Sequence, residues 1–191
     1  MILLTAHRRE NLGEPMRNMF RAIKQIVEEY QRVQVVYPVH LNPLVREAAG
    51  DILGNNPRVH LIEPLDVKDF HNFMNRAEII LTDSGGVQEE APSLGTPVLV
   101  MRDTTERPEG IHAGTLKLAG TNQTTIYTLI KNLLEDKKIY QQMSKATNPY
   151  GDGDASYRIA EAIKYHFGIK KDRPKHFIFL IDFKSLDSEG K

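Results

Sequence analysis

The sequence predicts an α/β fold: a Rossmann-like parallel sheet with helices on both faces. Short apolar runs typical of strands alternate along the chain with longer segments in which apolar residues recur at helical spacing. These longer segments leave room for the crossover helices that join parallel strands. Polar and glycine-rich residues follow several strand-type runs, and sheets of this kind bind ligands at the carboxyl ends of their strands.

Strands are expected where the apolar runs are short, at residues 2–5, 33–39, 59–62, 79–82, 97–101 and 114–118. Helices are expected at residues 16–30, 43–53, 66–76, 87–94, 124–134, 137–146 and 155–167. In the first of these helices, Met16, Phe20 and Ile23 share one face. Gly54 and Gly95 mark the ends of two others.

The 191 residues suit a single domain, because the alternation of strands and helices continues to about residue 168. We therefore expect one domain over residues 1–168 and an atypical tail over residues 169–191. The tail holds a basic cluster and then an apolar run at residues 177–183, which is rich in strand formers and typical of an edge strand.

The composition argues against several broad classes. Lys and Arg number 25, as do Asp and Glu, so the balance gives no support to a nucleic-acid or membrane-surface partner. The absence of cysteine excludes disulfides and thiolate metal sites, and it fits an expected place in the cytoplasm. No stretch approaches the roughly 20 apolar residues of a membrane span. The amino-terminal apolar run is shorter than the core of a signal peptide.

The strongest local pattern is a strand, a glycine turn and a helix start at residues 82–90. Gly85 and Gly86 let the backbone approach a phosphate, and the first helical turn offers N–H groups to it. Ser84 adds a hydroxyl donor, and Glu90 is within reach of a ribose diol. The alternative is a plain strand–helix turn with a polar cap.

A second cluster, His7, Arg8, Arg9, Glu10 and Asn11, follows the first strand. Histidine can move a proton near neutral pH, and arginine makes fork-like contacts with phosphate. The alternative is a solvated loop.

A third polar loop, at residues 102–110, follows the fifth strand. Arg107 is suited to a diphosphate, with Glu106 or Glu109 orienting it; the alternative is a salt-bridged surface loop. His40 follows the second strand and is either a ligand contact or a structural group. The remaining histidines are expected to be structural, and none has metal-ligand spacing: His60, His71, His112, His166 and His176.

Three segments carry a resemblance to a known family: TAHRRENLG at 5–13, LTDSGGVQEEAP at 81–92 and VMRDTTERPE at 100–109. Over residues 2–167 the chain resembles the carboxy-terminal domain of bacterial non-hydrolysing UDP-N-acetylglucosamine (UDP-GlcNAc) 2-epimerases. The resemblance implies one half of a glycosyltransferase-B-like pair of Rossmann-type domains, with the active site in the cleft between them. It also implies a homodimer.

The resemblance further implies roles for individual residues. Ser84, Gly85 and Gly86 would hold the UDP phosphates, and Glu90 would bind the ribose. Arg107 and His7 would contact the phosphate side of the ligand, with His7 as the catalytic residue of this half, and Phe70 would lie by the uracil. A second UDP-GlcNAc acts as an allosteric activator in some members, and the matching residues here are His7, Arg8, Glu10 and His40.

The family reaction interconverts UDP-GlcNAc and UDP-ManNAc. UDP is eliminated across C1–C2 and adds back with inverted stereochemistry at C2, so neither a redox cofactor nor a metal is needed. The catalytic carboxylates and a glycine-rich loop belong to the first domain, and this chain has neither. We therefore expect it to bind UDP but to need the missing amino-terminal domain for turnover.

Three alternatives stay open at this point. A fragment of a glycosyltransferase of the same half-fold would transfer sugar to an acceptor. A hydrolysing epimerase would release free ManNAc and UDP. A non-catalytic nucleotide-sugar-binding module would show affinity without turnover.

Overall fold

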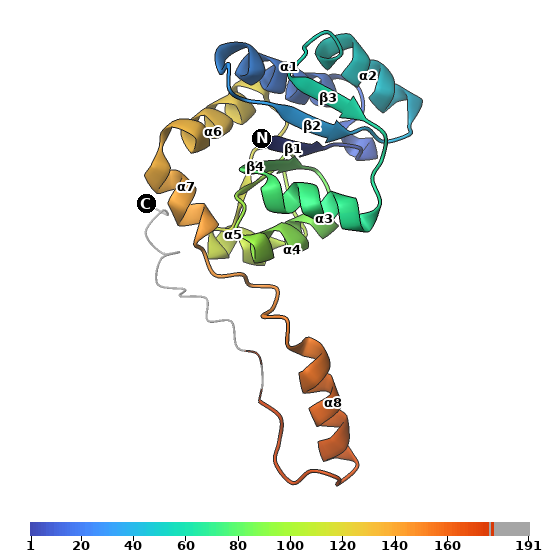
Figure 1. Cartoon of the computed structure of the whole chain (residues 1–191), viewed down its shortest axis with the longest axis vertical. Helices are drawn as coiled ribbons and strands as arrows, with labels where there is room; N and C mark the ends of the chain where they lie inside the picture. Colours follow the sequence, from blue (N-terminus) through green and yellow to red (C-terminus); the bar gives the residue numbers. More distant parts are fainter. Residues whose placement is uncertain (176, 178–191) are drawn as a thin grey trace. The chain divides into compact units, whose positions relative to one another are not determined.

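Six parallel strands form a single sheet in the order β3-β2-β1-β4-β5-β6 in the computed structural model, which describes residues 1–175 and residue 177 (Figure 1). The strands are β1 (Ile2–Thr5), β2 (Val35–Pro38), β3 (Val59–Ile62), β4 (Ile79–Thr82), β5 (Val98–Val100) and β6 (Leu116–Leu118). The chain winds outward from β1 to β3, returns to β4 beside β1, and then winds outward again. Such a reversal of strand order is where ligands bind in open α/β sheets. The predicted fold class is confirmed.

The first five α-helices lie between consecutive strands, and the last three follow the sixth strand. They are α1 (Glu14–Glu29), α2 (Pro43–Leu53), α3 (Val67–Arg76), α4 (Gly85–Glu90), α5 (Pro108–Ala113), α6 (Gln123–Glu135), α7 (Lys137–Ser144) and α8 (Ala155–His166), with 3-10 turns η1 (Arg9–Asn11) and η2 (Ala91–Leu94). Side-chain caps fix several starts, because Asn42, Asp66 and Asn122 each accept a hydrogen bond from a backbone N–H of the first turn.

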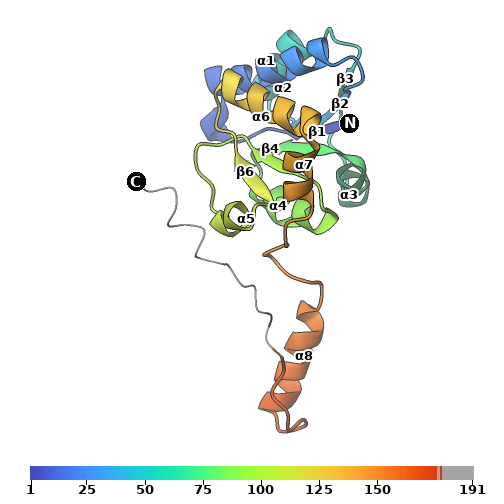
Figure 2. The same cartoon turned by 90° about the vertical axis from the view of Figure 1, so that its left-hand side faces the viewer.

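The two faces of the sheet are covered by different helices, as expected for strands buried on both sides (Figure 2). Alternation along β1 shows the division: Ile2 and Leu4 pack against α1, α2 and α6, whereas Leu3 faces α3 and α4. Phe20 of α1 and Tyr37 of β2 are fully buried in the larger cluster. These two layers hold the carboxyl ends of the strands in a fixed frame.

In two predicted segments the kind of element differs from the structure, for local reasons. The helix expected at 87–94 begins earlier, at Gly85, and ends in the 3-10 turn η2, because Pro92 has no N–H to continue the α-helical pattern. The loop expected at 102–110 ends in the short helix α5, which begins at Pro108, a favourable first helical residue. Gly95 and Gly114 close these helices with positive φ, which glycine adopts without strain.

The chain divides into two compact units, Met1–Thr147 and a second unit that begins at Asn148. In the second unit, Arg158 of α8 makes a bidentate ion pair with Asp152. The expected domain boundary at residue 168 stays a prediction. The edge strand expected at 177–183 lies almost wholly outside the described residues. No helix in the described part of the chain combines the length and the apolar character needed to cross a membrane.

Candidate functional site

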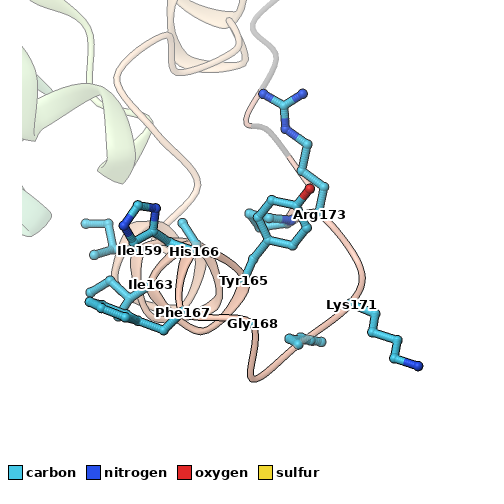
Figure 3. A pocket seen from close by; sticks show the side chains of 11 residues that line it. Ile159, Ile163, Tyr165, His166, Phe167, Gly168, Lys171 and Arg173 are labelled. Carbon is cyan, nitrogen blue, oxygen red and sulfur yellow. The ribbon is translucent and has the colours of Figure 1, made fainter.

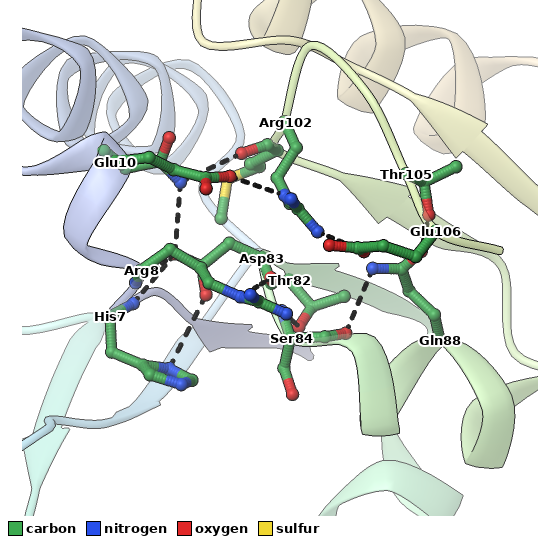
Figure 4. A network of polar contacts seen from close by, with 12 residues as sticks. His7, Arg8, Glu10, Thr82, Asp83, Ser84, Gln88, Arg102, Thr105 and Glu106 are labelled. Carbon is green, nitrogen blue, oxygen red and sulfur yellow. Dashed lines mark hydrogen bonds and ion pairs between the residues drawn. The ribbon is translucent and has the colours of Figure 1, made fainter.

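A buried carboxylate organises the point where strand order reverses. Asp83 directly follows β4 and is completely inaccessible to solvent. Its Oδ2 accepts hydrogen bonds from the backbone N–H groups of His7 (2.9 Å) and Arg8 (2.8 Å) and from the side-chain amide of Asn11 (3.2 Å) (Figure 4). The loop after β1 is thereby folded around the end of β4. A buried carboxylate is stable only with such donors around it.

Two threonines set the start of the glycine turn. Thr5 and Thr82 occupy matching positions in the parallel pair β1–β4, and their hydroxyl oxygens lie 2.6 Å apart. The Thr82 hydroxyl also accepts a hydrogen bond from the backbone N–H of Ser84 at 3.0 Å. The end of β4 is therefore tied both to its neighbour strand and to the turn that begins α4.

A hollow of about 280 Å³ opens beside this turn. It is bordered by residues from the ends of β1, β2 and β4 and by α3 and α4, namely Thr5, Ala6, His7, Pro38, His40, Pro64, Leu65, Phe70, Ser84 and Val87. His7 and His40 stack with ring centroids 5.2 Å apart and planes inclined by 11°. Its walls are mostly apolar or aromatic, which suits a planar ring, while the start of α4 offers N–H groups.

The two glycines of the turn are not required by backbone strain. Neither Gly85 nor Gly86 has positive φ. A Cβ at Gly85 would lie 3.6 Å from Nη2 of Arg8, and one at Gly86 would lie 3.8 Å from Oε1 of Glu90, both ordinary contact distances. Folding alone therefore does not demand glycine at either position. The missing side chains leave the first turn of α4 open, beside the guanidinium of Arg8, to an anionic group.

A buried cation organises the loop after β5. Arg102 is only 6% exposed, and its guanidinium donates to Glu10 (2.7 Å) and to Glu106 (2.5 Å) (Figure 4). The bond from Arg102 lowers the pKa of the Glu106 carboxyl to about 2, and its two partners raise the pKa of Arg102. The Thr105 hydroxyl donates to Oε1 of Gln88, which joins this loop to α4.

The structure gathers some of the predicted site residues and pairs others elsewhere. His7, His40, Phe70 and Ser84 line the hollow, and Gly85 and Gly86 form the adjoining turn. The remaining predicted residues do not line it. Instead Glu10 pairs with Arg102, Glu90 pairs with His71 at 3.0 Å, Arg107 donates to Glu89, and Arg8 donates to the backbone carbonyl of Asp83. The binding and allosteric roles expected for these side chains stay predictions.

Sequence reasoning assigned no role in the site to Asp83 or Arg102, although both are buried centres of the polar network. A charged residue that directly follows a buried strand is a usable signal, because it sits where burial and ligand binding meet. Thr5 and Thr82 were also missed, since their pairing depends on which strands are neighbours.

A second hollow lies within the second unit and contains none of the predicted site residues (Figure 3). Its volume is about 960 Å³, and Ile159, Ile163 and Phe167 of the α8 region line it. These three side chains are each more than half exposed, so the hollow is an apolar surface and not a formed site. Among the described residues, no group of three or more His, Asp or Glu side chains is arranged to hold a metal ion.

Comparisons with known proteins identify related sequences. A sequence model of the family described as UDP-N-acetylglucosamine 2-epimerase matches residues 1–164. The chain is 68% identical over 177 residues to the UDP-N-acetylglucosamine 2-epimerase of Bacillus subtilis (strain 168). That alignment covers 93% of this chain and 47% of the relative, so the chain spans about half the length of the curated relatives it matches.

Solved structures show the same partial coverage. The S. aureus MnaA–UDP co-structure is 56% identical with a TM-score of 0.88, over 93% of this chain and 48% of that one. The UDP-GlcNAc 2-epimerase from Neisseria meningitidis bound to UDP-GlcNAc is 49% identical with a TM-score of 0.81, over 85% and 44%. The C-terminal domain of a Francisella tularensis group 1 glycosyltransferase, at 15% identity and a TM-score of 0.58, shares the fold alone.

Proposed function

This chain belongs to the UDP-N-acetylglucosamine 2-epimerase family, and we propose on that basis that it supplies the UDP-binding half of an enzyme that interconverts UDP-GlcNAc and UDP-ManNAc. The single observation that carries the proposal is the hollow at the reversal of strand order, joined to an open glycine turn. Solved relatives contain UDP or UDP-GlcNAc.

The proposed pose places each part of UDP against a matching group. The uracil lies in the hollow against Phe70, where an aromatic ring gives a planar contact surface. The diphosphate meets the first turn of α4 at Gly85 and Gly86, with Ser84 and His7 beside it. Glu90 accepts from the ribose diol after exchanging its contact with His71.

The proposed reaction asks this half of the site to stabilise departing UDP. Preorganised backbone N–H groups, His7 and Arg107 are suited to the charge that develops on the diphosphate. The reaction also needs groups that remove and return the C2 proton. Asp83 is committed to three donors, Glu10, Glu89 and Glu106 are held in ion pairs with arginines, and Glu90 is hydrogen-bonded to His71. We therefore assign proton transfer at C2 to the half of the relatives that this chain does not span.

Calorimetric titration with UDP tests the binding half of the proposal. We expect saturable binding that Phe70→Ala weakens about twofold to twelvefold, since a stacked aromatic contact contributes about 0.5–1.5 kcal/mol. Arg107→Ala is expected to weaken binding of UDP more than binding of uridine, because the proposal brings the Arg107 charge to the diphosphate. Arg46→Ala is the matched control, since Arg46 pairs with exposed Glu63 and does not line this hollow. A folded chain that binds no UDP would overturn the proposal.

Product analysis tests the catalytic half. Incubation of the chain alone with UDP-GlcNAc is expected to give no UDP-ManNAc, whereas a full-length relative under the same conditions does. Epimerisation by the chain alone would show that it carries its own proton-transfer groups. Free ManNAc with UDP would indicate a hydrolysing reaction instead, and sugar transfer to an acceptor would indicate a glycosyltransferase. UDP affinity without turnover, even when the missing half is supplied, would indicate a binding module.

A further inference from the structure

Asp83 has one oxygen whose role the fold does not explain. Oδ2 accepts the three hydrogen bonds that close the loop after β1. Oδ1 is equally buried, and among the residues that the structure describes it receives no hydrogen bond of good geometry. The polar atom that faces it is Nδ1 of His7, 3.5 Å away (Figure 4). An unsatisfied buried carboxylate oxygen is costly, so a proton on Nδ1 that points toward it is strongly favoured.

We infer that Asp83 is a positioning residue that fixes the tautomer of His7, holding the ring proton on Nδ1 and leaving Nε2 for the ligand in the hollow. A neutral imidazole carries its proton on one nitrogen only, and the hydrogen bond made by that nitrogen decides which. His7 lines the hollow, and its side chain is 39% exposed, so the ring has one side on Asp83 and another open to a ligand.

His40, which stacks on His7, is expected to have the opposite tautomer. His40 accepts a hydrogen bond at Nδ1 from the backbone N–H of Asn42 at 3.1 Å. Its neutral ring therefore carries the proton on Nε2. Two parallel rings 5.2 Å apart are thus held in different protonation patterns by different partners, a main-chain N–H for His40 and a carboxylate for His7.

The consequence for the site concerns which nitrogen exchanges protons with a ligand. With Nδ1–H directed at Asp83, the free lone pair of His7 is on Nε2. When Nε2 takes a proton from water, the ring becomes a cation and that N–H donates a hydrogen bond to a phosphate oxygen. The identity of that ligand rests on the proposed function, but the tautomer is a property of the chain and is measurable without any nucleotide.

An isosteric substitution gives a sharp test, because the three donors around Oδ2 dictate how an amide would sit. In Asp83→Asn, the amide oxygen must take the place of Oδ2 to accept from His7, Arg8 and Asn11. The NH2 group then replaces Oδ1 and points at Nδ1 of His7. A donor facing Nδ1 requires the lone pair there, so the proton moves to Nε2.

Two-bond 1H–15N spectra of the chain labelled in histidine read out both rings. They are recorded without ligand at a pH about two units above the usual histidine pKa of about 6.5, so that neutral rings are observed. We expect Nδ1–H for His7 and Nε2–H for His40 in the unsubstituted chain, with His7→Gln assigning the His7 signals. Asp83→Asn is expected to move the His7 proton to Nε2 and to leave His40 and the distant His60 unchanged.

Two results would overturn the inference: an Nε2–H tautomer of His7 in the unsubstituted chain, or an Nδ1–H tautomer that persists in folded Asp83→Asn. The tautomer of His7 in the unsubstituted chain is measured without any variant, so the inference can be tested even if Asp83→Asn fails to fold. Since Nε2–H is the commoner form of histidine in water, finding Nδ1–H at His7 is positive support. A chain that shows the expected tautomers but binds no UDP would contradict the proposed function alone.

Discussion

Two buried charges stand at the same edge of the sheet, and they are held in opposite ways. Asp83, after β4, is surrounded by donors that are mostly main-chain N–H groups. Arg102, after β5, is held by the side chains of Glu10 and Glu106, which are 53% and 51% exposed. Asp83 is therefore held mainly by the backbone, whereas Arg102 is held by two flexible, partly hydrated side chains.

The difference indicates what each loop can do. Main-chain donors move only with the backbone, so we expect the loop after β1 and the turn after β4 to form a rigid frame for the hollow. Half-exposed glutamates can be solvated by water when they leave Arg102, and salt weakens their pairing with it. We therefore expect the β5 loop to adjust around a ligand, while the frame around Asp83 stays in place.

Removing the anionic centre is expected to have the largest effect on stability. Asp83→Ala leaves the N–H groups of His7 and Arg8 and the amide of Asn11 without their acceptor. The expected loss in the free energy of unfolding is about 3 kcal/mol, because buried donors lose their partner. Urea unfolding followed by circular dichroism measures it.

Asp51→Ala is the control for that prediction, since Asp51 is 54% exposed and pairs only with Arg17 in the described ion pairs. Its expected cost is below about 1 kcal/mol. Equal losses for the two variants would contradict the view that Asp83 organises the frame.

Replacing the cationic centre is expected to cost less. Arg102→Met fills the buried space with an apolar chain and leaves two carboxylates that water can solvate. We expect a loss of about 1–2 kcal/mol, and a smaller loss in high salt. Unfolding at low and high ionic strength checks this, and a loss as large as that of Asp83→Ala would remove the contrast between the two centres.

A third substitution tests whether hydrogen bonds to the backbone hold the loop after β1. The hydroxyl of buried Tyr37 donates to the backbone carbonyl of Ala6 at 2.6 Å, and burial raises the pKa of Tyr37. Tyr37→Phe is expected to cost about 1 kcal/mol, because the carbonyl loses its donor. Thermal unfolding measures the change. Phe20→Leu, which alters the same core without a polar contact, separates lost packing from the lost hydrogen bond.

The smallest expected effect is a pH dependence of the stability that the Glu106–Arg102 ion pair contributes. The pKa of Glu106 is lowered in the folded chain to about 2 from an ordinary value near 4.5. Its pairing with Arg102 therefore stabilises the fold fully above about pH 4.5 and is lost as the pH falls toward 2. Glu106→Gln should lose less stability than the unsubstituted chain between pH 6 and pH 3. If the same difference persists in an Arg102→Met background, Arg102 is not its cause.

The fold was largely readable from the sequence, because apolar periodicity reports which faces are buried. The strand at residues 2–5 and the helix at 43–53 have the predicted bounds, since a turn or a capping residue marks their ends. The helix at residues 108–113 was missed, since residues 102–110 were read as loop, because a short helix among charged residues has no apolar period to reveal it. The bounds of α4 were shifted because Gly85 and Gly86 are poor helix formers by propensity.

The candidate site was only partly readable. Residues after strands were found because the carboxyl edge of a parallel sheet is a general binding location. Their partners were not found, since the side-chain contacts of Glu10, Glu90 and Arg107 depend on side-chain directions that no sequence period encodes. Asp83 and Thr82 were quoted in the motif, but their burial follows from the neighbourhood of β1 and β4, which is a property of strand order.

The most direct test of the account is a titration of the 15N-labelled chain with UDP, followed by amide 1H–15N spectra. We expect saturable shifts at Gly85 and Gly86, together with His7 and Phe70, and no shift at Gly54 or at Gly151 of the second unit. That result would place the nucleotide in the hollow at the reversal of strand order. Saturable shifts confined to other residues, or a folded chain whose Gly85 and Gly86 signals do not move, would contradict it.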